Sequence, residues 1–112
     1  MNEAALHLAV IDAARLMLRR EVIWWHTPNG GFRNAREAGK LRRMGTLAGM
    51  PDLLFLRAGA LCGIELKGPK GRISPAQKAT IAALTEAGAQ IAVCRDMGEV
   101  IAAWRKWNLC AR

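Results

Sequence analysis

The segment MPDLLFLRAGALCGIELK, from Met50 to Lys67, decides the fold of this chain. It holds two short apolar runs, Leu53–Leu56 and Leu61–Leu66, separated by Arg57–Ala60. Short apolar runs on either side of a glycine-containing turn are typical of paired β-strands. The segment therefore predicts an antiparallel hairpin.

The charged residues of this hairpin gather at its open end. If the turn is symmetric about Ala58 and Gly59, Asp52 lies directly opposite Glu65, and Lys67 shares their face of the sheet. Opposed residues have Cα atoms only about 4.5–5.5 Å apart, so two carboxylates there repel each other unless a cation separates them. A hard divalent cation such as Mg²⁺ would bind both, and a lysine beside it could activate water and offset transition-state charge. The alternative is a chance pair of acids beside a solvated lysine.

The rest of the chain alternates between helical and strand patterns. The strand 61–66 is followed by a helix and then by another strand, which implies a crossover connection and a mixed sheet. The expected fold class is α/β, with one domain over residues 1–112 and helices flanking a mixed β-sheet. Helices are expected over 3–19, 74–87 and 97–107, strands over 22–25 and 90–94, and a short helix or ordered loop over 33–44.

The composition favours a polyanionic partner. The 112 residues include 17 Lys and Arg against 9 Asp and Glu, a net charge of +8, which points to nucleic acid. No apolar run of about 18 residues is present, so we expect no membrane association and a location in the cytoplasm. The cysteines Cys62, Cys94 and Cys110 are too far apart for a zinc motif and are expected to be buried free thiols.

Two basic segments flank the acidic pair in the sequence. They predict a groove in which arginine and lysine hold the nucleic-acid backbone while the carboxylates hold metal. The alternative is an ordinary solvated charged surface. The residues in question are Arg33, Arg36, Lys40, Arg42 and Arg43 before the hairpin, and Lys70 and Arg72 after it.

Several residues near these motifs have two interpretations. Ser74–Gln77 has the pattern of a helix N-cap with a capping box, but Gln77 is also a candidate active-site residue. His26 could face the site, although a lone histidine at a strand end is commonly structural. The adjacent Trp24 and Trp25 must point to opposite faces of a strand, which places one of them at a candidate interface.

Three motifs in this order resemble the PD-(D/E)xK nuclease superfamily, and more narrowly the virus-type replication-repair nuclease (VRR-NUC) domain. They are Pro51-Asp52, Glu65-Leu66-Lys67 and Ser74-Pro75-Ala76-Gln77, and the resemblance covers about residues 3–107. It implies a restriction-endonuclease-like core and phosphodiester hydrolysis that depends on Mg²⁺ or Mn²⁺. Such modules occur alone in phages and bacteria, which agrees with an unexported protein.

The resemblance also implies roles for individual residues. Metal ligation would involve Asp52, Glu65 and the backbone carbonyl of Leu66, with catalytic support from Lys67 and from Gln77, which matches a glutamine of the family. An acidic residue on the first helix commonly completes the site. Glu3 is the candidate near the helix start, with Asp12 and Glu21 as alternatives.

The expected function is therefore a structure-selective DNA endonuclease. A chain of 112 residues has no room for a separate recognition domain, so a homodimer cutting four-way (Holliday) junctions would supply selectivity through its symmetry. The first alternative is a non-catalytic nucleic-acid-binding domain on the same fold. A domain that binds small phosphates ranks below both, because a glycine-rich strand-to-helix loop is missing from the sequence.

Overall fold

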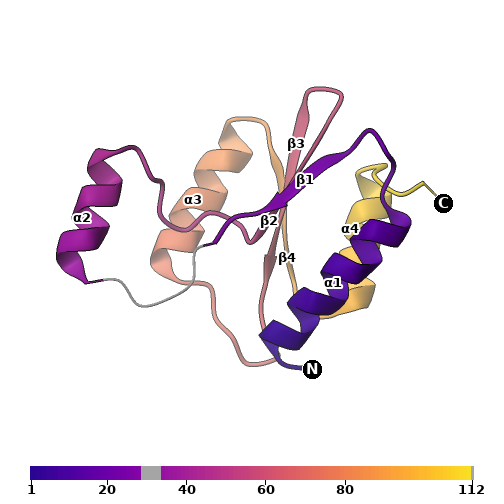
Figure 1. Cartoon of the computed structure of the whole chain (residues 1–112), viewed down its shortest axis with the longest axis horizontal. Helices are drawn as coiled ribbons and strands as arrows, with labels where there is room; N and C mark the ends of the chain where they lie inside the picture. The colour runs from indigo at the N-terminus through magenta and orange to yellow at the C-terminus, as the bar shows by residue number, and fades with distance from the viewer. Residues whose placement is uncertain (29–33, 112) are drawn as a thin grey trace.

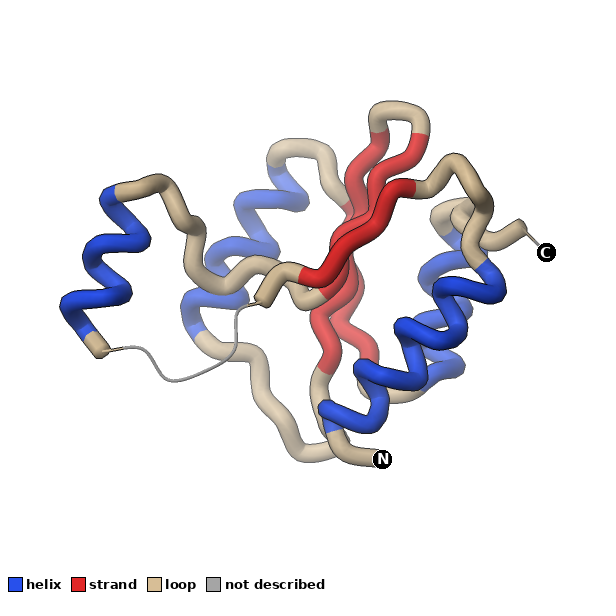
Figure 2. Tube along the Cα trace, viewed as in Figure 1, coloured by secondary structure: helices blue, strands red, loops and turns tan. Residues whose placement is uncertain are grey.

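The computed structural model describes residues 1–28 and 34–111. Helices lie on both sides of a single sheet in the described chain, as Figures 1 and 2 show. The elements are, in order, α1 (Glu3–Met17), β1 (Ile23–His26), α2 (Ala35–Arg43), β2 (Leu53–Arg57), β3 (Ala60–Leu66), α3 (Pro75–Glu86), β4 (Gln90–Cys94) and α4 (Met97–Lys106).

The four strands form a mixed sheet in the order β1-β2-β3-β4, which confirms the predicted α/β class. The strands β1, β2 and β3 are antiparallel neighbours, whereas β4 runs parallel to β3 because α3 carries the chain across. The hairpin pairs Leu53 with Ile64 and Arg57 with Ala60, which is the register that a turn symmetric about Ala58 and Gly59 requires. These two turn residues have φ angles of 49° and 79°, as a two-residue hairpin turn commonly needs.

The main hydrophobic core lies between the sheet and the pair α1 and α4 (Figure 2). Phe55 of β2 meets Trp104 of α4 edge to face at 6.1 Å, and Leu6 and Val10 of α1 pack into the same cluster. The three cysteines are buried free thiols, as expected. The helix α1 ends at Met17 rather than near Arg19, because Leu18 takes an extended conformation and pairs with Cys110.

The opposite face of the sheet is covered only in part. The helix α3 packs against β4, and the outer part of this face, on β1 and β2, stays exposed. Ile23, Trp25 and Leu56 there are 63%, 40% and 39% exposed, and we call these three residues the β1–β2 patch. Trp24 packs against the core on the other face, so the two tryptophans separate as their adjacency predicted.

The segment 33–44, for which the sequence allowed either a short helix or a loop, contains the helix α2. Asn34 accepts a hydrogen bond from the Glu37 amide and caps α2, which stands apart from the sheet at the left of Figure 1. Every described residue in and around α2 is at least partly exposed. No helix in residues 1–28 and 34–111 is long and apolar enough to cross a membrane.

Candidate active site

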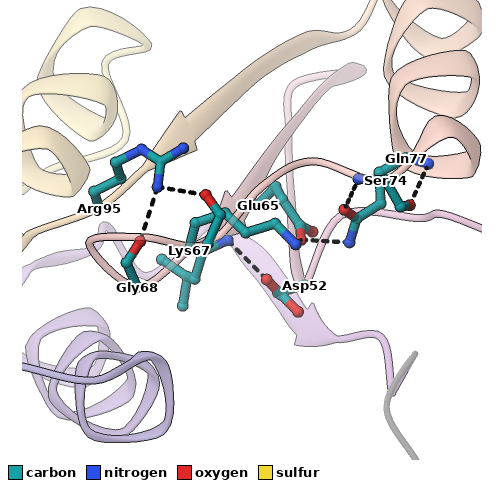
Figure 3. Close-up of polar contacts among 9 residues, drawn as sticks. Asp52, Glu65, Lys67, Gly68, Ser74, Gln77 and Arg95 are labelled. Atoms are coloured by element: carbon teal, nitrogen blue, oxygen red, sulfur yellow. Dashed lines mark hydrogen bonds and ion pairs between the residues drawn. The ribbon is translucent and has the colours of Figure 1, made fainter.

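Asp52 and Glu65 lie side by side at the open end of the β2–β3 hairpin. The pairing of Leu53 with Ile64 carries the next residue on each strand into opposition, so the predicted juxtaposition is observed. Asp52 Oδ2 accepts a hydrogen bond of 2.7 Å from the Leu66 amide, which fixes the half-buried carboxylate across the hairpin (Figure 3). The carboxylate therefore stays at the strand end instead of turning to solvent.

Glu65 is the most unusual residue of the site, because it has an ionisable side chain and is only 2% exposed. Its Oε2 accepts from Gln77 Nε2 at 2.7 Å and lies 3.4 Å from Lys67 Nζ. Its Oε1 is buried and has no hydrogen-bond partner among the described residues. Burial and the neighbouring Asp52 charge raise the pKa of Glu65 to about 7, against a smaller lowering effect of Lys67.

Gln77 caps α3 and also contacts Glu65. Its backbone nitrogen donates to Ser74 Oγ at 3.1 Å, and its Oε1 accepts from the Ser74 backbone nitrogen at 2.9 Å. These two hydrogen bonds form the predicted capping box at the start of α3. Its Nε2 is the group that donates to Glu65. One side chain thus caps a helix and orients a buried carboxylate.

Lys67 is the residue directly after β3. Its backbone nitrogen donates to the Cys94 carbonyl at 3.0 Å, and its side chain is 12% exposed. The ammonium therefore reaches back toward Glu65 from within the protein surface (Figure 3). An ion pair so shielded is screened less by salt than an exposed one.

A contact that sequence reasoning missed joins the segment before Pro51-Asp52 to α3. Thr80 Oγ1 donates to the Ala48 carbonyl, and Gly49 has a φ of 78°. A Cβ on Gly49 would lie 2.8 Å from the Gln77 nitrogen and closer still to the Ala76 carbonyl oxygen. Only glycine permits so close a contact. The segment before Asp52 therefore packs against the turn of α3 that carries Gln77.

Arg95 is a second residue that sequence reasoning did not single out. It follows β4, and its Nη1 donates to the carbonyls of Gly68 and Gly71 at 2.8 Å each (Figure 3). These carbonyls belong to the turn directly after Lys67. The sequence offered no signal, because an isolated arginine at a strand end is usually a solvated side chain.

His26 lies next to the site through the backbone of Asp52. Its Nδ1 is 2.8 Å from the Asp52 carbonyl oxygen, and because a carbonyl only accepts, Nδ1 is the donor. The ring also meets His7 of α1 edge to face at 4.6 Å. The contact is with the main chain and therefore agrees with the structural interpretation of this histidine.

Glu3 is placed near the site but in no contact with its carboxylates. The start of α1 lies against Gly68, where an added Cβ would be 3.6 Å from the Glu3 nitrogen. Glu21 instead pairs with Arg57 at 3.5 Å, at the turn end of the hairpin and away from Asp52. Within the described residues, no three His, Cys, Asp or Glu side chains converge on one point. The role of Glu3 stays a prediction.

The basic residues fall into two separate groups. Lys70 and Arg72 are exposed in the loop that joins β3 to α3, and the other group is carried by α2, which stands away from the sheet (Figure 1). The members on α2 are Arg36, Lys40, Arg42 and Arg43, all exposed. Arg33 lies outside the described residues.

The donor set at the hairpin suits a hard divalent cation. A carboxylate whose pKa is raised by burial and by a neighbouring carboxylate, with one buried oxygen lacking a partner among the described residues, is what an oxygen-binding cation would stabilise. Asp52 and Glu65 supply these oxygens, and the Leu66 carbonyl stays a predicted further ligand. The three cysteine thiols lie in the core and are not ligand candidates here.

Comparison with known proteins agrees with this geometry. A solved structure described as a "VRR_NUC domain protein" has the same fold, with a TM-score of 0.74 at 24% identity, over 96% of this chain and 88% of the other. None of the curated proteins matches. The VRR-NUC domain family matches residues 2–97, which confirms the family that the three motifs indicated. The chain therefore belongs to the VRR-NUC domain family.

Proposed function

We propose that this chain is a Mg²⁺- or Mn²⁺-dependent, structure-selective DNA endonuclease. Its family points to nuclease-type activity on DNA. The observation that carries the metal dependence is the buried Glu65, which lies opposite Asp52 with Oε1 unpartnered. A bound divalent ion would polarise the scissile phosphodiester and lower the pKa of a water.

The protein groups have distinct roles in this proposal. Asp52, Glu65 and the Leu66 carbonyl would hold the ion, and the Leu66 amide keeps Asp52 in place. Lys67 would orient the attacking water and offset the charge that develops on the phosphoryl oxygens. Gln77 keeps Glu65 aimed into the site through a hydrogen bond of 2.7 Å. Glu3 would complete the acidic set from α1.

The basic groups would bind the DNA backbone on both sides of the acids. Phosphate contacts by arginine and lysine carry no base information, so selectivity would come from DNA shape. The loop residues Lys70 and Arg72 follow Lys67 closely in the chain, and α2 presents a second basic surface. This arrangement supports backbone binding, and the proposed substrate is branched DNA, with four-way junctions favoured.

We further propose a homodimer that uses the β1–β2 patch. Its members lie on adjacent strands of a sheet face that α3 leaves open, and β1 is an edge strand. Contact with a second copy of the chain would remove these neighbouring apolar side chains from water. Light scattering at micromolar concentration should show a dimer of the 12.2 kDa chain and a monomer for Trp25→Glu. A wild-type monomer would remove the dimer while leaving the nuclease proposal intact.

A cleavage assay tests the central proposal. Four-way junctions, flaps, duplexes and single strands are incubated with Mg²⁺, Mn²⁺ or EDTA, using wild-type protein and Asp52→Asn. We expect metal-dependent cutting that is fastest on junctions and is lost in Asp52→Asn, whose fold is checked by circular dichroism. DNA binding without cleavage under every metal condition would instead support the non-catalytic binding domain. Equal rates on junction and linear duplex would remove the junction preference alone.

A further inference from the structure

The loop after β3 begins with a tight turn that is closed from two sides. The Gly71 amide donates to the Gly68 carbonyl at 3.1 Å, with Pro69 at the second turn position, where its fixed φ is favourable. From outside the turn, Arg95 Nη1 donates to the carbonyls of Gly68 and Gly71 (Figure 3). One nitrogen atom thus joins both ends of the turn.

This turn lies against the side chain of Lys67. A Cβ on Gly71 would be 3.3 Å from Lys67 Cδ, so the glycine backbone already packs on the aliphatic part of the lysine. The Lys67 backbone is held separately by the Cys94 carbonyl. Two adjacent residues at the end of β4 therefore restrain Lys67. Cys94 holds its main chain, and Arg95 holds the turn that packs on its side chain.

Arg95 is itself anchored at its backbone. Its amide nitrogen donates to Glu99 Oε1 at 2.7 Å, and the Glu99 amide donates to the N-cap residue Asp96 at 2.8 Å. The first turn of α4 thereby fixes the point from which the guanidinium extends. The contact with the turn is thus made from a rigid element.

We propose that Arg95 is a positioning residue that keeps the Lys67 ammonium beside Glu65 by holding the Gly68–Gly71 turn against the lysine side chain. The inference rests on the proposed function, in which Lys67 is a catalytic residue. A lysine side chain is long and flexible, and a displacement of about 1 Å in an active site can slow a reaction on the order of 100-fold. Because Lys70, a proposed DNA contact, lies in the same turn, the rate of the chemical step is the readout specific to Lys67.

The kinetic test compares Arg95→Gln with Arg20→Gln, which removes the same charge beyond the end of α1. We expect Arg95→Gln to lower kcat about 10-fold or more with a change in KM below about threefold, and Arg20→Gln to leave both unchanged. The glutamine is too short to reach both carbonyls. A loss confined to KM would overturn the proposal, because the chemical step would then not depend on how Arg95 holds Lys67.

A double-mutant cycle shows whether Arg95 acts through Lys67. Single-turnover rates with excess enzyme are compared for Arg95→Gln, Lys67→Met and the pair. We expect the Arg95 substitution to have little further effect once Lys67 is absent, because residues acting as a unit are not additive. Independent, multiplying effects would refute the proposed route.

A readout that needs no activity comes from trypsin, which cleaves after Lys70 and Arg72. Without the Arg95 hydrogen bonds the turn should open more often, so mass spectrometry should find faster cutting there in Arg95→Gln than in Arg20→Gln. Equal cutting rates would show that Arg95 does not hold the turn. If wild-type protein cleaves no DNA, the proposed function fails, and the trypsin comparison still decides whether Arg95 holds the turn.

Discussion

At the scale of single residues, the distinguishing feature of the candidate site is the buried side chain of Glu65. Glu65 is buried beside another carboxylate, and ionising a carboxyl group in such surroundings destabilises the folded state. Lys67 and Gln77 both contact its Oε2, which leaves Oε1 available for a ligand. A metal ion bound as proposed would therefore offset part of this cost.

The metal-free protein should become less stable as pH rises from 5 to 8. The pKa of Glu65 is raised from 4.5 to about 7 by folding, so the folded state binds the proton more tightly. This contribution is fully present below about pH 4.5 and is lost as pH rises through about 7. Urea unfolding in EDTA measures it, with Glu65→Gln as the control. A difference between the two proteins that does not change with pH would contradict the assigned pKa.

At the scale of elements, the first turn of α3 joins secondary-structure formation to the site. The capping box orders the helix start, and the same Gln77 side chain reaches Glu65 on β3. On its other side, this turn receives the backbone of Gly49. The helix therefore aligns the two segments that carry Asp52 and Glu65.

Ser74→Ala and Gln77→Ala separate capping from catalysis. Each removes part of the capping box and should lower stability by about 0.5–2 kcal/mol. Only Gln77→Ala also removes the hydrogen bond to Glu65, so it should slow cleavage about 10-fold while Ser74→Ala stays near the wild-type rate. Thermal unfolding and single-turnover rates measure the two effects. Equal loss of activity in both variants would assign Gln77 to the cap alone.

Gly49→Ala tests the contact between the Asp52 segment and α3. The change should destabilise the protein more than Gly45→Ala, because both glycines have positive φ angles but only Gly49 is surrounded by backbone atoms. The backbone strain shared by both sites is about 1–3 kcal/mol, and the clash adds to it at Gly49 alone. Comparing the two melting temperatures isolates the clash. Equal shifts would show that the contact is not tight.

At the scale of the whole molecule, the charge and the layers of the fold determine how DNA can approach. The core side of the sheet is covered by α1 and α4, whereas α2 stands away from the sheet on the other side (Figures 1 and 2). A net charge of +8 on 112 residues supports binding to the backbone, and the exposed β1–β2 patch is apolar. The surfaces proposed for DNA binding and for assembly are therefore different.

Replacing Arg42 and Arg43, or Lys70 and Arg72, by alanine should weaken DNA binding without regard to sequence. A variant that has lost one phosphate contact releases about one counterion fewer when it binds DNA. The slope of log affinity against log salt should therefore become shallower by about one for each residue replaced. Fluorescence anisotropy at several salt concentrations measures this slope. An unchanged slope would place the pair on solvated surface, with Arg20→Ala as the reference for charge lost elsewhere.

The sequence by itself determined the local features of this protein. The turn at Ala58-Gly59 specified the hairpin register and so the opposition of Asp52 and Glu65, and Ser74–Gln77 specified the start of α3. Periodicity identified the strands and the helices other than α2, and the crossover helix implied a mixed sheet, in which β3 and β4 run parallel. Such features follow from short-range geometry, because neighbouring residues are constrained by the chain itself.

Only the tertiary structure decided which distant groups support the site. Arg95 reaches back to Gly68, Thr80 reaches Ala48, and Gln77 reaches Glu65, although none of these pairs is close in the chain. Such contacts depend on how helices pack on the sheet, and many side chains of the same type could make them. Burial of Glu65, and hence its raised pKa, has the same origin, since it needs α3, β3 and the Asp52 segment to come together.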